Sequence, residues 1–321
     1  MKILKTLSIT AFFAFMSLGC LNAQDLAEAV DLYNSGIKAF QDSQFAQAIN
    51  DVEKALQMLT SIEDDEQAAS LKTNCENIIP QLYLSQAKQQ VNTKQFAEAL
   101  QTLDKAKELA EKYNNDEVLI FVEDLMPQVY IAKGGAEIEA GNVEGGIAEY
   151  RKALELNKTN STIYLRIGLA QRANNEDDAV ATFDQIIAMD GAKTDDVGTA
   201  KKQAATIFLK RAAAAQPAKQ WSVVYENAKK ATGYDNANMQ AFRLLGLSTI
   251  ELKKWREAVE ACETVLNADP SAKDKNTLIY RLATAYENLN NKSKACSYYK
   301  QIVGDANFKA FAEGKVRSLC Q

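Results

Sequence analysis

Pairs of small residues separated by twelve positions recur along this chain, and they constrain its fold more than any other feature. These pairs are Gly36 with Ala48, Ala87 with Ala99, Gly134 with Gly146, Gly246 with Ala258, and Ala283 with Ala295. Gly168 and Ala179 are one residue closer together, and Ala212 is followed by the larger Val224. Two antiparallel helices can cross closely only where both present little side chain. The spacing therefore predicts a series of similar helical hairpins.

A bulky residue stands just before the second small residue of most pairs. These residues are Phe45, Phe96, Val143, Trp221 and Trp255. Such side chains would fill the space beside each crossing. Apolar residues elsewhere recur at helical spacing, and no alternating run bounded by turn residues indicates a strand. The chain is predicted to be all-α.

One repeated unit resembles a known family. The segment NMQAFRLLGLSTIELKKWREAVEACETVLNADP, residues 238–270, resembles the tetratricopeptide repeat (TPR) of about 34 residues. The family pattern asks for an aromatic residue, a Leu-Gly pair, an alanine and a terminal proline, and residues 242, 245–246, 258 and 270 supply them. Thr249 and Cys262 are smaller than the family residues at their positions. The resemblance extends over about residues 25–303.

The resemblance implies a right-handed superhelical solenoid of about seven TPR-like helix pairs, occupying residues 24–321 as one domain. Residues 78–84 are echoed by residues 125–131, with Pro80 and Pro127 at matching places. Each proline either kinks a long helix or starts a new one. Residues 307–320 read as an amphipathic capping helix with Phe308, Phe311 and Val316 on one side. A solenoid end needs such a cover.

The first residues are typical of a secretory signal peptide. Lys2 and Lys5 precede an apolar run over residues 7–18, and small and polar residues follow. Cleavage after Ala23 would release a periplasmic or secreted protein, whereas a lipoprotein-type cut before Cys20 would leave a lipid-anchored one at the outer membrane. The apolar run is shorter than the roughly 20 residues of a membrane span. No integral membrane span is expected.

Composition disfavours several functions. The net charge is −5, and removing Lys2 and Lys5 would make the mature chain more acidic, so nucleic acid is not an expected partner. Histidine is absent, which removes the commonest general acid-base and most zinc sites. Residues 141–146 are glycine-rich but read as a turn, and the acidic residues 63–66 read as a helix start. We expect no enzymatic activity, cofactor or metal.

Four cysteines follow residue 23, at positions 75, 262, 296 and 320. None has the spacing of a zinc or redox motif. Cys262 occupies a core position of its repeat. Export would permit disulfides, and Cys296 and Cys320 would pair if the capping helix ran back along the helix that begins near Lys292; otherwise they remain free thiols.

The binding surface of the family is the concave groove lined by the first helix of each pair. The resemblance places in it Tyr33, Ile37 and Phe40 toward the N-terminus, and Arg166, Arg172, Lys210, Arg243, Leu247, Tyr280 and Arg281 toward the C-terminus. Four of these cations recur at nearly equivalent places in successive first helices. That basic row predicts a partner segment with carboxylates.

The sequence therefore predicts a non-enzymatic scaffold or adaptor of the bacterial cell envelope that binds a partner peptide or protein in its groove. A surface lipoprotein that assists nutrient or glycan capture is the alternative. Glycan capture would favour exposed tryptophans, but Trp221 and Trp255 fall at packing positions. The partner, the process and the oligomeric state do not follow from the sequence.

Overall fold

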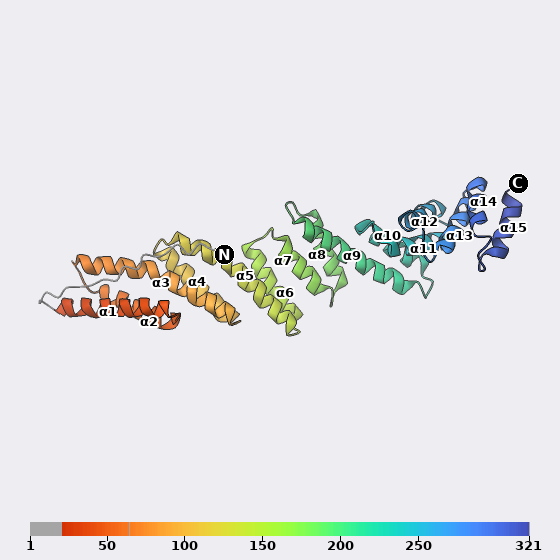
Figure 1. Cartoon of the computed structure of the whole chain (residues 1–321). Helices are drawn as coiled ribbons and strands as arrows, with labels where there is room; N and C mark the ends of the chain where they lie inside the picture. The colour runs from red at the N-terminus through yellow and green to blue at the C-terminus, as the bar shows by residue number, and fades with distance from the viewer. Residues whose placement is uncertain (1–20, 64, 321) are drawn as a thin grey trace. The chain divides into compact units, whose positions relative to one another are not determined.

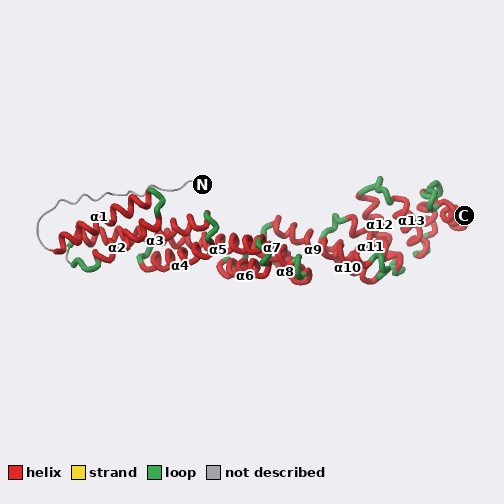
Figure 2. Tube along the Cα trace, turned by 90° about the horizontal axis from the view of Figure 1, so that it is seen from below, coloured by secondary structure: helices red, strands yellow, loops and turns green. Residues whose placement is uncertain are grey.

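The computed structural model describes residues 21–63 and 65–320, with side chains from residue 24 onward (Figure 1). Fifteen helices occupy this part of the chain, with loops between them and no strand (Figure 2). The prediction of an all-α fold is confirmed. Residues 1–20 of the predicted signal segment 1–23, including Cys20, lie outside the described residues, and the expected cut after Ala23 falls in the first turn of α1.

The contacts divide the chain into two compact units, one ending at Lys158 and the other beginning at Thr159. The sequence had predicted one domain over residues 24–321. The described part of unit 1 holds α1 (Leu21–Gln41), α2 (Phe45–Leu59), α3 (Glu66–Asn92), α4 (Phe96–Lys112), α5 (Asp116–Glu139) and α6 (Val143–Leu156). Each of these helices packs against the next, as Figure 1 shows.

Unit 2 continues the same pattern of consecutive packed helices. It holds α7 (Ser161–Gln171), α8 (Glu176–Ala188), α9 (Thr194–Ala215), α10 (Trp221–Tyr234), α11 (Met239–Glu251), α12 (Trp255–Ala268), α13 (Lys275–Asn288), α14 (Lys292–Gln301) and α15 (Lys309–Leu319). In the described part of the chain, α1 to α14 form seven successive pairs and α15 follows them. This is the predicted number of pairs with a capping helix.

Small residues do mark the close crossings. A Cβ added at Gly36 would lie 2.6 Å from Val52 Cγ2 and 3.1 Å from the Ala48 carbonyl oxygen. At Gly246 a Cβ would lie 2.9 Å from Cys262 Sγ. The second contact differs from the prediction, since Cys262 and not Ala258 faces Gly246. A cysteine smaller than the family residue suits so close an approach.

The bulky residues of the sequence pattern begin the second helices. Phe45, Phe96, Val143, Trp221 and Trp255 are the first residues of α2, α4, α6, α10 and α12. A left-handed residue stands two positions before each of these five, as at Lys94 with φ 62° and Gly141 with φ 90°. The backbone N–H of the following residue then donates to a backbone carbonyl of the preceding helix, as from Gln95 N to Gln90 O at 2.8 Å. These five hairpin turns are thus closed by the same local geometry.

The two alternatives for the prolines are resolved by the structure. Pro80 lies inside α3 and Pro127 inside α5, so each belongs to one long helix and neither starts a new one. The acidic residues near position 65 also behave as a helix start, because the Asp65 side chain accepts hydrogen bonds from the backbone N–H of Gln67 and Ala68.

The capping helix was predicted over residues 307–320 and is observed as α15. Its Ala312 is buried, and Phe308, Val316 and Leu319 pack against the core of α12 to α14. Phe311 keeps 44% of its surface exposed. Unit 2 therefore ends in a helix that covers the last pair.

Candidate functional site

The first helices of the pairs in unit 2 form a continuous layer. α7 contacts α9, α9 contacts α11, and α11 contacts α13. Side chains join neighbouring helices of this layer: Arg172 donates to Gln203 Oε1, and Arg243 Nε donates to Asp274 Oδ2 at 2.9 Å. We call the surface of α7, α9, α11 and α13 the first-helix face. It carries the seven predicted site residues of the C-terminal half.

Two cations of the predicted row are already paired with the chain's own carboxylates. Lys210 Nζ lies 3.0 Å from Glu176 Oε1, and that hydrogen bond is the main cause that lowers the pKa of Glu176. Arg243 Nε lies 2.9 Å from Asp274 Oδ2. The row predicted from the sequence is therefore not a line of free positive charges, because acids from neighbouring helices neutralise part of it.

Arg281 differs from these cations. It is half-buried on α13, and none of the described residues forms a hydrogen bond or an ion pair with its guanidinium. Burial lowers its pKa, while the nearby Asp274 and Glu251 only partly offset that effect. Asp274 is engaged by Arg243. Arg281 is consequently a partly desolvated cation without a bonded counter-charge.

Arg166 on α7 is exposed, and no described residue forms a hydrogen bond or ion pair with it either. Leu169, one turn further along α7, exposes 41% of its surface. Leu247 on α11 is half-buried. The first-helix face thus carries exposed or half-buried apolar side chains as well as two arginines that no described residue pairs.

Tyr280 was predicted to line the groove, but its ring packs mainly against the capping helix. Its centroid lies 5.0 Å from that of Phe308 in a stacked arrangement and 5.4 Å from that of Phe311. The cause is α15 with its N-cap residue, which supply Phe311 and Phe308. Tyr280 therefore contributes to the packing of α15 on α13.

The predicted N-terminal site residues are largely buried, so the prediction is wrong for Tyr33 and Ile37. They keep only 8% and 6% of their surface and belong to the core formed by α1, α2 and α3. Burial raises the pKa of Tyr33. Phe40 is half-buried, and its ring centroid lies 5.9 Å from that of Phe45. Packing of α2 and α3 onto α1 is what removes these side chains from the surface.

Unit 1 carries an exposed apolar pair that was not predicted from the sequence. Ile120 exposes 67% and Phe121 45% of its surface on α5. A signal was present, because Val118 and Val122 are one helical turn apart and face the core. Residue 120, two positions from each valine, must then point away from it.

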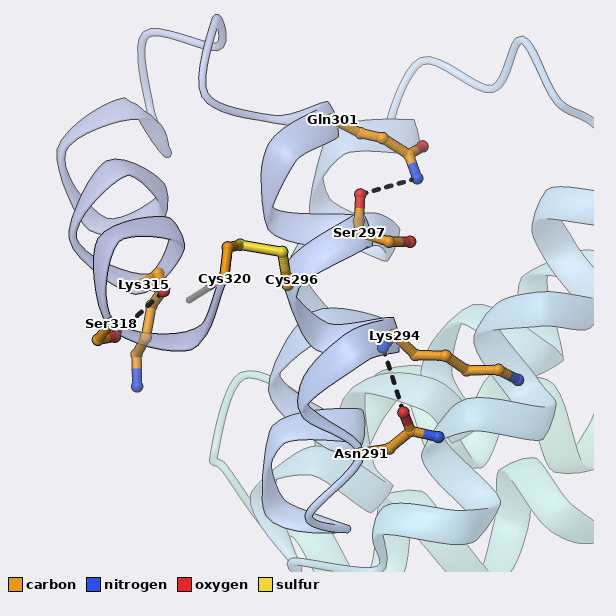
Figure 3. The surroundings of a disulfide bond; sticks show 8 residues. All are labelled: Asn291, Lys294, Cys296, Ser297, Gln301, Lys315, Ser318 and Cys320. Atoms are coloured by element: carbon orange, nitrogen blue, oxygen red, sulfur yellow. Dashed lines mark hydrogen bonds between the residues drawn. A yellow bond between two sulfur atoms is a disulfide. The ribbon is translucent and has the colours of Figure 1, made fainter.

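Cys296 and Cys320 form a disulfide, with their Cα atoms 5.5 Å apart (Figure 3). Figure 3 shows the bridge joining the end of the capping helix to the first half of α14. Cys75 and Cys262 are buried free thiols, and burial raises the pKa of each to about 12. Neither is suited to nucleophilic chemistry at neutral pH.

Other site types find little support in the described residues. No group of three or more metal-ligating side chains is present in residues 21–63 and 65–320. No helix in this same part is long and apolar enough to cross a membrane. Trp221 and Trp255 are half-buried and pack against core clusters, as the sequence predicted.

Comparison with known families identifies the repeat. A model described as tetratricopeptide repeat matches residues 163–189 and 278–305, and a second model of the same description matches residues 127–160. The sequence has no match among curated proteins.

Among solved structures, the chain is similar to one titled crystal structure of MamA protein, at 18% identity and a TM-score of 0.33, covering 57% of this chain and 93% of that one. It is also similar to a complex of yeast Sti1, titled TPR2AB-domain:pHSP90-complex, at 15% identity and a TM-score of 0.35, covering 92% and 99%. A third, YrrB, is titled a TPR protein with an unusual peptide-binding site, at 14% identity and a TM-score of 0.27, covering 78% and 98%.

Proposed function

We propose that this chain, which carries tetratricopeptide repeats at residues 127–160, 163–189 and 278–305, is a non-enzymatic scaffold or adaptor that holds a partner protein on its first-helix face. The proposed partner segment is extended or helical and carries at least one carboxylate. Its place is the bacterial cell envelope, reached by means of the signal-like residues 1–23. Cleavage after Ala23 gives a periplasmic or secreted protein, and lipidation at Cys20 gives an outer-membrane lipoprotein.

Arg281 is the observation that carries this proposal. Removing a cation from water is costly unless a counter-charge with matching hydrogen bonds replaces the lost hydration. The chain supplies no bonded carboxylate to Arg281 among its described residues. A partner carboxylate can accept two parallel hydrogen bonds from a guanidinium, and such charge-assisted bonds are stronger where water is partly excluded.

Apolar contacts would complete the recognition. Leu247 lies on α11, the neighbour of α13 in the layer, and Leu169 lies on α7. Arg166 provides a second unpaired cation at the other end of the face. A segment that spans several first helices would thus meet a carboxylate site at each end and apolar side chains between them.

A photo-crosslinking amino acid tests the proposal in cells that produce the protein. Placed at Leu169, which is 41% exposed on the first-helix face, it should form a discrete adduct with a partner protein. Placed at Val223, which is 44% exposed on the second helix α10, it should not. Arg281→Ala should abolish the Leu169 adduct. Equal adducts at both positions, or an adduct indifferent to Arg281→Ala, would contradict the proposal.

The proposed export has its own test. The intact mass of the purified protein should correspond to a chain that begins at Gln24, or to one that begins at a lipidated Cys20. Recovery of a chain that retains Lys2 and Lys5 from the cytoplasmic fraction would refute export and leave the binding proposal to be tested separately.

A further inference from the structure

The N-terminal half of α5 presents an apolar surface that helix pairing does not require. Residues 116–126 precede the segment 127–160 that matches the repeat. Val118 and Val122 in this half are buried against α4, whereas Ile120 and Phe121 are exposed by 67% and 45%. Among the large exposed apolar residues of the described chain, these two alone are adjacent in the sequence.

Carboxylates surround this pair without neutralising cations on the same helix. Asp116, Glu117, Glu123 and Asp124 are all exposed, and α5 has no Lys or Arg before Lys133. Glu117 and Asp124 lie three or four positions from Ile120 and Phe121, so they share their side of the helix. None of the four acids forms an ion pair with a described residue; the Asp124 carboxylate accepts one hydrogen bond, from Gln128 Nε2.

The chain itself shows which charge this surface attracts. Lys88 of α3 places its Nζ 4.9 Å from the centroid of the Phe121 ring. A cation over an aromatic face is a favourable contact. Part of Phe121 is exposed and the neighbouring carboxylates are not in ion pairs, so a positively charged group of another molecule can also bind here.

From this placement we infer that Ile120 and Phe121, with Glu117 and Asp124, form a second docking surface, which takes a basic amphipathic helix of a partner protein. Apolar side chains of that helix would cover Ile120 and Phe121, and its Lys or Arg residues would face Glu117 and Asp124. An anionic membrane is not the occupant, because the carboxylates would repel its head groups. This surface is in unit 1, and its charge preference is opposite to that of Arg281.

The test uses the purified chain and two labelled peptides: a short amphipathic helix of Leu and Lys, and its charge-inverted counterpart of Leu and Glu. The Leu/Lys peptide should bind through this surface. Any binding of the Leu/Glu peptide should be indifferent to substitutions here, because its carboxylates suit the first-helix face instead. Ile120→Ser combined with Phe121→Ser should weaken binding about tenfold, as expected for the loss of one interface hot spot. Glu117→Gln with Asp124→Asn should weaken it at low salt and remove most of its salt dependence.

Val223→Ser is the matched control, since it removes a comparably exposed apolar side chain from unit 2. It should leave the affinity unchanged, and circular dichroism should show the same helicity for every variant. Arg281→Ala should also have no effect here, which separates this surface from the first-helix face. Equal binding of the Leu/Lys peptide to the wild type and to the Ile120/Phe121 double variant would overturn the inference, as would attachment of anionic vesicles through these residues.

Discussion

Gly134 of α5 and Gly146 of α6 meet backbone against backbone. A Cβ built on Gly146 would lie 2.5 Å from the Gly134 carbonyl oxygen, and one built on Gly134 would lie 2.8 Å from the Gly146 carbonyl oxygen. Real Cβ atoms do not approach other atoms so closely, and a backbone carbonyl cannot rotate away as a side chain can. The two helices cross at this distance only because both positions are glycine.

Gly134→Ala should therefore lower the free energy of unfolding by about 1–3 kcal/mol, since the crossing must open to admit a methyl group. Gly135→Ala is the matched control on the same helix. There the nearest atom to a new Cβ is Tyr150 Oη at 3.7 Å, an ordinary contact. It should be neutral or stabilising by about 0.5–1 kcal/mol, because alanine favours the helix. Urea melting measures both, and similar effects of the two substitutions would refute the crossing.

A second prediction concerns the hairpin turns. Lys94 holds φ at 62° between α3 and α4, a conformation that costs a side-chain-bearing residue free energy. Lys94→Gly should raise the free energy of unfolding by about 0.5–1 kcal/mol. Lys201→Gly, in the interior of α9, should instead lower it by about 1 kcal/mol. A loss of stability at position 94 equal to that at position 201 would contradict the left-handed turn.

The disulfide gives a third prediction. It joins residues 24 positions apart in the sequence, so chain entropy alone predicts a stabilisation of about 3 kcal/mol. Cys296→Ser with Cys320→Ser should lower the unfolding free energy by about this amount. Thiol labelling of the denatured, unreduced chain from Gln24 onward should modify Cys75 and Cys262 only. Four reactive thiols would show that the bridge does not form.

Acid sensitivity supplies a fourth prediction. Glu149 is buried on α6, and its Oε1 accepts from Lys133 Nζ at 3.0 Å and Lys152 Nζ at 3.1 Å. Burial alone would raise its pKa, but hydrogen bonds and charge attraction from the two lysines outweigh burial and lower the pKa below its usual range. A carboxylate with a lowered pKa stabilises the fold above its ordinary pKa, and that stabilisation is lost as the pH falls through the folded-state value.

Glu149→Gln should consequently flatten the pH dependence of stability. Between pH ~5 and pH ~3, the wild type should lose about 1 kcal/mol more than this variant does. Urea melting at a series of pH values measures the difference. Parallel curves for the two proteins would mean that Lys133 and Lys152 do not lower the pKa of Glu149 in the folded state.

The hairpins were predictable because their determinants are local. The pairing of Gly36 with Ala48 and the placement of Phe96 and Trp255 lie within single repeats, so spacing alone locates the crossings and the starts of the second helices. The capping helix followed from its amphipathic pattern. An antiparallel course of the capping helix also suggested that Cys296 and Cys320 could meet.

Which site residues are buried or paired with carboxylates was not predictable in the same way. Asp274, which engages Arg243, lies 31 positions away, and Glu176 lies 34 positions from Lys210. Counting cations along first helices therefore overestimated the free positive charge. Burial of Tyr33 also depends on a neighbouring pair. The division at Lys158 had no signal either, because the matched repeat 127–160 runs across it and another match begins at residue 163.

The central claim, that Arg281 anchors a partner carboxylate, is tested most directly by selecting short random peptides on the immobilised chain and sequencing those retained. The wild type should enrich peptides with Asp, Glu or a free C-terminal carboxylate beside an apolar residue. Arg281→Ala, with unchanged helicity, should lose that enrichment, and Arg281→Lys should keep part of it because it retains the charge without the guanidinium fork. Enrichment that is absent in the wild type, or identical in Arg281→Ala, would contradict the account.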